Sequence, residues 1–397
     1  MSEDTTRFFF SPVRIVTGAG CVGVVGDELR RLGVSKALVV SDPGVRKAGI
    51  VDKVGVLLES DKIPYTVFDG IKPNPTVENV VAGTEALGTG VRGTGIVAVG
   101  GGSVMDAAKM IGALATNGGK VQDYDGVDMI PRRALPLIAI NTTAGTASEV
   151  TRWAVITDVE RSVKMAIGDE NIIPDVAIDD PELTLGLPPV VTAQTGMDAL
   201  THAIEGYVGK NHTPLTDAMA VEAITQIGAC LETAVRDGSN IAARAGMMYA
   251  QTAAGLAFEN AGVGNAHAMA HQLGAVHDMA HGLANAVLLP YVMEFNAPVC
   301  LERMARIAQL LGTDVSGFDT GRAAAQAAAA VARLNKAIGI PASLGECGLD
   351  SVDLDLLAKK ALADGATTTN PRDTSLEEMR ALWAAAYEGA LQARTLV

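Results

Sequence analysis

Cysteine, aromatic side chains and positive charge are all scarce in this sequence, and each shortage excludes a class of protein. The four cysteines, Cys21, Cys230, Cys300 and Cys347, lie far apart along 397 residues. They fit neither a zinc knuckle nor a disulfide framework, and they indicate buried free thiols in a reducing compartment. Lys and Arg total 31 against 45 Asp and Glu, a net charge of −14, which argues against nucleic acid as a partner.

Targeting and membrane signals are missing as well. The N-terminus, MSEDTTRFFF, has no basic n-region and no apolar h-region, so we expect no signal peptide. No run of the chain approaches the roughly 18 apolar residues that a membrane-spanning helix needs. We therefore predict a cytoplasmic protein that does not bind a membrane.

Apolar residues are plentiful, at 48%, although only 4% of the chain is aromatic. A core of Ala, Val, Leu and Ile suits packed helices and buried parallel strands. Strand-like and helix-like segments alternate up to Leu187, beginning with the strand-like residues 7–17 and including a helix over 45–61; helical periodicity alone follows. The pattern predicts an α/β domain over residues 1–187 and an all-helical domain over residues 188–397.

Two glycine-rich segments compete as the phosphate-binding loop of a nucleotide site. GAGCVG, residues 18–23, fits the G-x-G-x-x-G template, but the pattern is weak alone and an ordinary turn is the preferred reading. GGGS, residues 100–103, follows a buried strand and opens a helix over 104–114. Its glycines permit close backbone approach and the free N–H groups at the helix start attract phosphate, although a plain tight turn is the alternative.

Polar residues follow other strands of this half. Asp42 ends the strand KALVVSD, where its carboxylate either holds a ribose hydroxyl or caps the turn SDPG. Asp106 and Lys109 lie in the first turns of the helix after GGGS. Five hydroxyl residues follow the strand LPLIAI and form either a ligand-binding loop or a helix-capping cluster: Thr142, Thr143, Thr146, Ser148 and Thr151.

Five of the six histidines gather in two segments of the helical half. Asp198 and His202 are four residues apart, as are His267 and His271, so each pair shares one helix face. His281 lies fourteen residues after His267, about 21 Å along an unbroken helix. One aspartate with three histidines suits Fe²⁺ or Zn²⁺ with room for a substrate oxygen; core histidines satisfied by their neighbours are the alternative.

A break in the second histidine segment is needed to bring His281 back to the same site. Gly274 and the polar pair His277-Asp278 indicate where the helix ends, so that His281 would start the next helix. His271 either binds the metal or relays a proton. His277 either relays a proton or is a polar turn residue.

Together, five motifs carry a resemblance to a known family. The chain resembles the iron-containing (group III) alcohol dehydrogenases, and in particular their lactaldehyde reductase/1,3-propanediol dehydrogenase branch. The motifs run in the family's order and cover nearly the whole chain: GGGSVMDAAK (100–109), TTAGTASEVT (142–151), GMDALTHAIEGY (196–207), HAMAHQLGAVHDMAHGLANAVLLP (267–290) and TNPRD (369–373).

The resemblance implies a Rossmann-like, parallel-sheet nucleotide-binding domain followed by an all-helical metal-binding domain, as in dehydroquinate synthases. It demotes GAGCVG to an ordinary turn. It implies the metal ligands Asp198, His202, His267 and His281. It makes His271 the catalytic histidine, with His277 as a second candidate for proton transfer, and places Phe258 and Trp153 near the substrate. The residues implied for NAD are Asp42, Asn74, Gly101, Gly102, Ser103, Asp106, Thr142, Thr143, Thr146, Lys164 and Leu183.

The implied activity is the NAD-linked interconversion of a small primary alcohol or diol and its aldehyde by hydride transfer, with Fe²⁺, Zn²⁺ or another divalent metal. The alternative is a sugar-phosphate cyclase or lyase of the dehydroquinate synthase type. That reaction needs basic residues to hold its substrate, and few Lys or Arg lie near the histidines. The resemblance also implies a homodimer or larger homo-oligomer, formed through the N-terminal strands around residues 8–16.

Overall fold

The computed structural model describes residues 6–88, 90–161, 163–349 and 352–391, and its chain forms two compact units. One unit is Ser11–Gly186; the other is Leu187–Val397 with the N-terminal segment that ends at Phe10. The sequence-based division assigned that segment to the first domain. Instead, the N–H of Phe10 donates to Asn260 Oδ1 (2.6 Å) and the Arg7 guanidinium to Asn211 Oδ1 (2.8 Å), which ties residues 6–10 to the helices.

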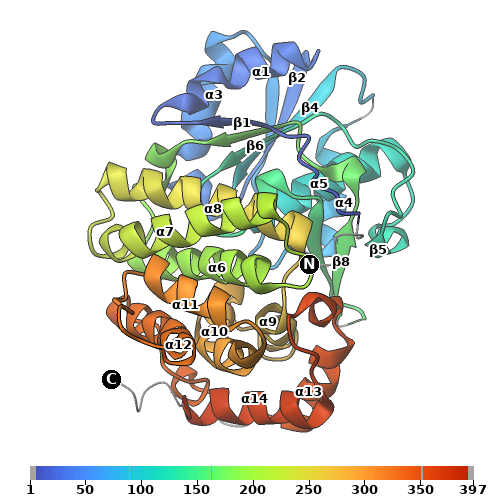
Figure 1. Ribbon diagram of the computed structural model, residues 1–397. Coiled ribbons are helices and arrows are strands. Elements are labelled where there is room, and N and C mark those ends of the chain that lie inside the picture. The colour runs from blue at the N-terminus through green and yellow to red at the C-terminus, as the bar shows by residue number, and fades with distance from the viewer. Residues whose placement is uncertain (1–5, 89, 162, 350–351, 392–397) are drawn as a thin grey trace. The chain divides into compact units, whose positions relative to one another are not determined.

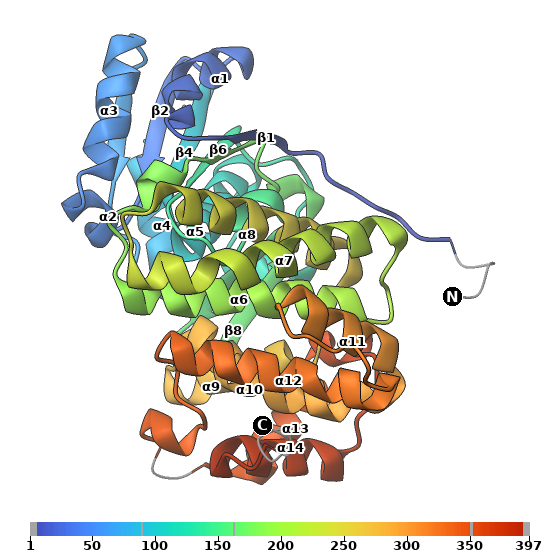
Figure 2. The same cartoon turned by 60° about the vertical axis from the view of Figure 1, so that its left-hand side comes forward.

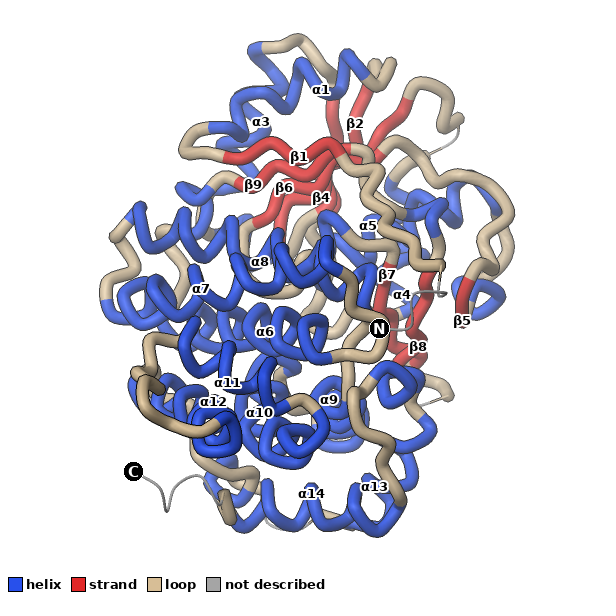
Figure 3. The backbone as a smooth tube through the Cα atoms, in the orientation of Figure 1, coloured by secondary structure: helices blue, strands red, loops and turns tan. Residues whose placement is uncertain are grey.

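A six-stranded parallel sheet forms the centre of the first unit (Figure 3). Its strand order is β1-β9-β6-β4-β2-β3. The chain leaves β2 to form β3 at one edge, then returns to place β4 on the other side of β2. The carboxyl ends of β2 and β4 therefore flank the point where the direction of winding reverses, which is where open α/β sheets bind ligands. The strands are β1 Arg14–Thr17, β2 Lys36–Val40, β3 Tyr65–Phe68, β4 Thr94–Gly100, β6 Leu137–Asn141 and β9 Val176–Asp179.

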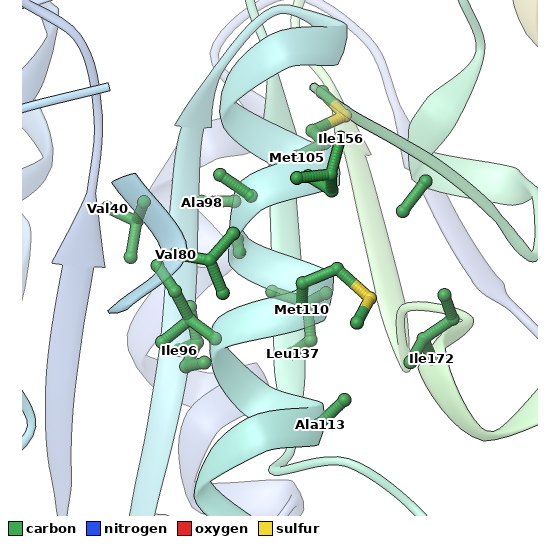
Figure 4. Packing of buried hydrophobic residues seen from close by; sticks show 14 of the residues in the cluster. Val40, Val80, Ile96, Ala98, Met105, Met110, Ala113, Leu137, Ile156 and Ile172 are labelled. Carbon is green, nitrogen blue, oxygen red and sulfur yellow. The ribbon is translucent and has the colours of Figure 1, made fainter. Parts of the chain in front are cut away.

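Alternate residues of each strand point to opposite faces of the sheet, and helices cover both. Ile96, Ala98 and Leu137 pack with Met105 and Met110 of α5 on one face (Figure 4). The other face carries a separate core that includes residues of α1 and α3. The predicted helix over 45–61 is two helices, α2 and α3. The helices of this unit are α1 Val25–Arg31, α2 Pro43–Lys47, α3 Ile50–Ser60, α4 Val77–Ala86 and α5 Gly102–Asn117.

A second, three-stranded sheet completes this unit, in the order β5-β8-β7. β7 (Trp153–Asp158) and β8 (Val163–Gly168) form an antiparallel pair, and β5 (Gly126–Val127) adds to β8. Only part of the first predicted strand forms: β1 covers Arg14–Thr17, and the described residues before it are not in a strand.

GAGCVG proves to be an ordinary turn. Gly20 has a left-handed backbone, with φ of 76°, and a short 3-10 helix follows over Cys21–Val24. The backbone N–H groups of Gly20 and Val22 donate to the two carboxylate oxygens of Asp180, at 3.1 and 3.2 Å. An anion of the chain itself thus occupies the donors that a phosphate would need.

The second unit is helical throughout its described part, as predicted (Figure 1). α7 packs against both α6 and α8, and Figure 2 shows the three lying alongside one another. α10 contacts α6, α9 and α12. The helices are α6 Pro189–Val208, α7 Pro214–Arg236, α8 Ile241–Ala261, α9 Asn265–His277, α10 His281–Asn296, α11 Leu301–Leu310, α12 Thr320–Ala337, α13 Leu354–Ala363 and α14 Leu376–Glu388.

One described helix, α7, is long and apolar enough by length and composition to cross a membrane. From the sequence we predicted no apolar run long enough to span a membrane. α7 packs along α6, α8 and α11, which is how a helix of a folded core packs. Length and composition of this one helix are therefore weak evidence for a membrane span.

Candidate functional site

Three helices supply the predicted metal-binding side chains. Asp198 and His202 lie one turn apart on α6, and His267 lies near the start of α9. The helix break needed for His281 occurs at the second of the two indicated positions, the pair His277-Asp278. Gly274 lies inside α9, which ends at His277 because Asp278 adopts a left-handed backbone with φ of 50°. His281 then begins α10, as expected.

The ligand atoms of Asp198, His267 and His281 lie within 4.8 Å of one another. Asp198 and His267 are buried, whereas the His281 side chain is 37% exposed. The start of α10 approaches α6 closely, since a Cβ at Gly282 would stand 2.4 Å from the carbonyl oxygen of Gln194. Glycine at this position therefore lets the first residue of α10 reach the carboxylate on α6.

His202 and His271 border this cluster through their rings. The His202 ring stacks on His267 at 4.5 Å between centroids, and on Phe258 at 4.2 Å. The His271 ring stacks on His281 at 5.5 Å. Four of the five grouped histidines therefore form one ring cluster, with Phe258 beside it. The group of ligand atoms within 4.8 Å does not include His202, whose role as a fourth ligand stays a prediction.

Glu205 fixes the orientation of His267, and the sequence reading missed it. Its Oε2 lies 2.6 Å from His267 Nδ1, and its two oxygens also accept the backbone N–H groups of Gly264 (2.8 Å) and Ala266 (2.7 Å). A carboxylate on Nδ1 leaves Nε2 as the lone-pair atom of the neutral ring. Glu205 follows Asp198 by seven residues on α6, and this shared helix face was the available signal.

Charge and burial set the protonation states of Asp198 and His267, and these states favour binding of a cation. Burial alone would raise the pKa of Asp198, but the neighbouring histidines and a hydrogen bond from Asn285 outweigh it, and the pKa lies below its ordinary value. Burial, and then the nearby histidines, hold the pKa of His267 well below its usual range. Near neutral pH the cluster therefore presents one anionic carboxylate and one neutral imidazole, the forms that bind metal.

Replacing Glu205 by glutamine is expected to weaken divalent-metal binding about 10–100-fold, as loss of the group that orients a ligand typically does. Three N–H donors face the carboxylate, so the NH₂ group of glutamine must oppose at least one of them.

Burial also raises the pKa of Glu205 to about 7. Wild-type metal affinity should therefore fall as pH drops through 7, and this part of the pH dependence should flatten in the variant. Chelator competition measures both; a wild-type profile would contradict the assignment.

His271 is paired with Asp364, a second residue that the sequence did not indicate. His271 Nδ1 lies 2.8 Å from Asp364 Oδ2. Burial tends to raise the pKa of Asp364, but the hydrogen bond and charge of His271 outweigh it and leave the pKa below its usual value. The ionised carboxylate holds the ring proton on Nδ1 and leaves Nε2 to accept one. Ninety-three positions separate the two residues, so no local pattern links them.

His277 is the other predicted proton carrier. It was predicted to lie in a turn, but it is the last residue of α9. Its side chain is half-buried. Among the described residues, the ring contacts of this region join His202, His267, His271, His281 and Phe258, and His277 is not one of them. Its part in proton transfer stays a prediction.

The first unit carries the glycine loop predicted to hold phosphate. α5 starts at Gly102 with Gly101 as its N-cap, and no side chain caps its N-terminal N–H groups. The loop packs tightly on the threonine segment after β6: a Cβ on Gly102 would meet Thr146 at 2.8 Å, and one on Gly101 would meet Thr143 at 3.0 Å. Backbone N–H groups at the start of a 16-residue helix suit a phosphate.

Asp42, Ser103 and Thr142, also predicted for NAD, follow strands at the same carboxyl edge of the sheet. Asp42 follows β2 and caps α2: its Oδ1 accepts the N–H groups of Gly44 (2.7 Å) and Val45 (3.0 Å), while Oδ2 takes part in neither bond. Both predicted readings of Asp42 are therefore compatible. Ser103 is the second residue of α5, and the buried Thr142 follows β6 directly.

Asn74 and Lys164 come together across 90 positions, with Lys164 Nζ donating to Asn74 Oδ1 at 2.9 Å. Asn74 also has a left-handed backbone, with φ of 54°. Leu183 lies in the buried core of the first unit, at 4% exposure, and its role toward NAD stays a prediction.

Asp106 and Lys109 are occupied inside the first unit. Asp106 accepts hydrogen bonds from the Ser148 hydroxyl (2.7 Å) and the Val155 N–H (3.0 Å), and burial raises its pKa. The buried Lys109 donates to Ser148 and to the carbonyl of Trp153. Trp153 itself starts β7 and packs over Gly168 of β8. These contacts brace the threonine loop, and the roles of Asp106 toward NAD and Trp153 toward substrate stay predictions.

Comparison with known families separates the two readings of this chain. Residues 12–181 match the family described as iron-containing alcohol dehydrogenase, and residues 192–387 match the C-terminal part of the Fe-containing alcohol dehydrogenase family. The chain belongs to the iron-containing alcohol dehydrogenase family. The predicted fold, family and dehydrogenase activity are thereby confirmed, and these comparisons do not support the dehydroquinate synthase alternative.

Members of this family match the chain over nearly its whole length. The NAD-dependent methanol dehydrogenase of Bacillus methanolicus is 43% identical, covering 94% of this chain and 98% of the relative. The 1,3-propanediol dehydrogenase of Klebsiella pneumoniae is 45% identical (93% and 96%), and the lactaldehyde reductase of Escherichia coli K12 is 40% identical (93% and 97%). A crystal structure of 1,3-propanediol oxidoreductase superposes with a TM-score of 0.94, at 44% identity, covering 96% of this chain and all of that one.

Proposed function

We propose that this iron-containing alcohol dehydrogenase interconverts a small primary alcohol or diol and its aldehyde, with NAD as the hydride carrier. The proposal rests on one observation above all. An aspartate and two histidines from three helices converge within 4.8 Å, and Glu205 holds one of the histidines in its ligand form. Similarity to relatives named for methanol, 1,3-propanediol and lactaldehyde supports a short substrate.

The donor set fits a divalent transition metal. Carboxylate oxygen and imidazole nitrogen are the ligands that Fe²⁺ and Zn²⁺ accept. We assign Asp198, His267 and His281 as ligands, and His202, next to His267, as the fourth. When bound, the metal supplies Lewis acidity that lowers the pKa of an alcohol. Glu205 keeps the proton of His267 on Nδ1, and Phe258, stacked on His202, supplies an apolar wall for a short carbon chain.

Alcohol oxidation releases a proton as well as a hydride, and His271 is suited to carry it. Asp364 holds the Nδ1 proton of the ring, so that Nε2 can accept another. The His271 side chain is 35% exposed, which opens a route from the ring to solvent. In the reverse direction the same ring delivers the proton to the carbonyl oxygen. His277 remains a second candidate for this relay.

The cofactor half of the reaction belongs to the loops at the carboxyl ends of β2, β4 and β6. The N–H groups at the start of α5 would hold the diphosphate, and Gly101 and Gly102 would let it approach the backbone. Asp42 would accept a ribose hydroxyl through its Oδ2. NAD, when bound there, takes up or returns the hydride.

An assay with short alcohols tests this function directly. Protein loaded with Fe²⁺ without air is mixed with NAD⁺ and 1,2- or 1,3-propanediol, and the absorbance of the reduced cofactor is followed. We expect turnover that chelator-stripped protein lacks and that restored metal recovers. A panel of short alcohols and aldehydes should then rank the substrates. No signal with any member of the panel would contradict the proposed function.

Exchange of Asp42 for asparagine is expected to relax the preference for NAD over NADP. Asparagine caps helices about as well as aspartate, so the variant removes the charge that repels a 2′-phosphate and keeps α2 capped. The KM for NADP should fall at least about tenfold, roughly 1.4 kcal/mol, with an unchanged melting temperature. An unaltered ratio of the two cofactor KM values would refute a ribose-facing role for Asp42.

We further propose a cytoplasmic enzyme that assembles as a homodimer or larger homo-oligomer. The scarce, unpaired cysteines support a reducing compartment. Phe8, at 83% exposure in the N-terminal segment, and the edge position of β1 support contact between copies there. Light scattering of the purified chain measures the assembly, and a monomer at working concentration would exclude it.

A further inference from the structure

Asn285 connects the three converging ligand atoms, although no motif drew attention to it. It lies on α10, one turn after His281, and is fully buried. Its Nδ2 donates to Asp198 Oδ1 at 2.8 Å, and lies 3.1 Å from His267 Nε2 and 3.2 Å from His281 Nε2. One amide group therefore touches every ligand atom of the cluster.

The lone pair of His267 can serve only one partner. Because Glu205 engages Nδ1, the neutral ring has a single lone pair, on Nε2. That lone pair either accepts an N–H of Asn285 or binds a cation. The same NH₂ group is electropositive, so a cation bound by Asp198 would repel it. Metal binding must therefore break the contact between the Asn285 NH₂ group and His267 Nε2.

The oxygen of the same amide indicates how the Asn285 side chain could rearrange. Asn285 Oδ1 is buried and has no hydrogen-bond partner among the described residues. A buried carbonyl oxygen without a partner costs free energy. A half-turn of the amide exchanges Oδ1 and Nδ2, which are nearly equal in size. It would bring an oxygen acceptor to the ligand atoms, and amide oxygens are accepted ligands of divalent cations.

We propose that Asn285 is a further member of the metal centre and acts as an amide switch. In the metal-free protein its NH₂ group donates to Asp198 and contacts His267 Nε2 and His281 Nε2. When a divalent cation binds, the amide turns and presents Oδ1 to it. The two orientations couple metal binding to the order of the ligand cluster. This inference rests on the proposed metal role of the three ligands, and goes beyond it.

Titration with Co²⁺ tests the switch, because the visible absorption of Co²⁺ reports its coordination. The full-length chain is stripped with chelator, and Co²⁺ is added in the absence of NAD and alcohol. Asn285→Asp keeps an oxygen and removes the competing NH₂ group, so we expect its Kd to fall by at least about tenfold, the scale of changes next to metal ligands. Asn285→Ala removes the oxygen, and we expect an altered Co²⁺ spectrum. If the carboxylate of Asn285→Asp prevents folding, Asn285→Ala still tests the proposal.

Asn335→Ala is the matched control. Asn335 is also a buried asparagine with an unpaired Oδ1, and its Nδ2 donates to the carbonyl of Ala286 on α10 at 2.6 Å. It makes none of the hydrogen bonds to ligand atoms found for Asn285. We expect a lower melting temperature with a wild-type Kd and spectrum for Co²⁺.

Two results would overturn the switch alone: wild-type Co²⁺ affinity and spectrum in both Asn285 variants, or an equal change in Asn335→Ala, which would reveal a packing effect. A different result would reach further. If the wild-type chain failed to bind Co²⁺, or His267→Ala bound it as tightly as wild type, the metal centre and the proposed function would fall together with the switch.

Discussion

Replacing His267 by alanine is expected to remove bound metal and alcohol oxidation together. His267 is buried, its pKa is held well below the usual range, and Glu205 orients it. Loss of its Nε2 takes away a ligand and leaves the Glu205 carboxylate without its imidazole partner. We expect metal affinity to fall by more than about 100-fold, beyond the loss typical of groups that only support a ligand.

Metal analysis and activity should be measured on the same His267→Ala preparations. His212→Ala is the matched control, because His212 is a histidine of the same unit whose ring contacts Arg303 and Asp217 instead of the ligand cluster. That control should retain wild-type metal content. A His267→Ala protein that kept its full metal content would refute the ligand assignment, whatever its activity.

Replacing His271 by alanine is expected to leave the metal in place and slow the reaction. The His271 ring stacks on His281, and its Nδ1 is paired with Asp364. This pairing leaves Nε2 as the ring atom that accepts or gives up a proton. General acid–base catalysis by a positioned side chain contributes about 10²–10⁴-fold, so kcat should fall by this order. Added imidazole should restore part of the lost rate, since it replaces the missing proton carrier.

The pairing with Asp364 can be tested by a conservative change. Asp364→Asn keeps an oxygen that accepts the Nδ1 proton of His271 and removes the charge, so its kcat should lie between those of wild type and His271→Ala. Metal content should be unaffected in both variants. Loss of metal from His271→Ala would make His271 a ligand and refute its assignment as a relay.

Local spacing was sufficient for most of the fold. The helical character of the second unit was predicted from its periodicity, because long periodic segments leave few alternatives. Of the two positions that indicated the end of α9, Gly274 lies inside the helix, because a single glycine is tolerated inside a packed helix. Asp278, in a left-handed conformation, ends the helix instead.

The sequence by itself determined the family, the two-part architecture and the histidines that gather at the cluster. It could do so because helix-face spacing and strand–loop–helix order are local properties of the chain. Only the tertiary structure revealed the partners of those histidines. Asp364 lies 93 positions from His271, and Asn285 meets Asp198 across 87. Such pairs form only when separate helices pack, so the orientation of each ring, and the role it can take, is decided by the folded protein.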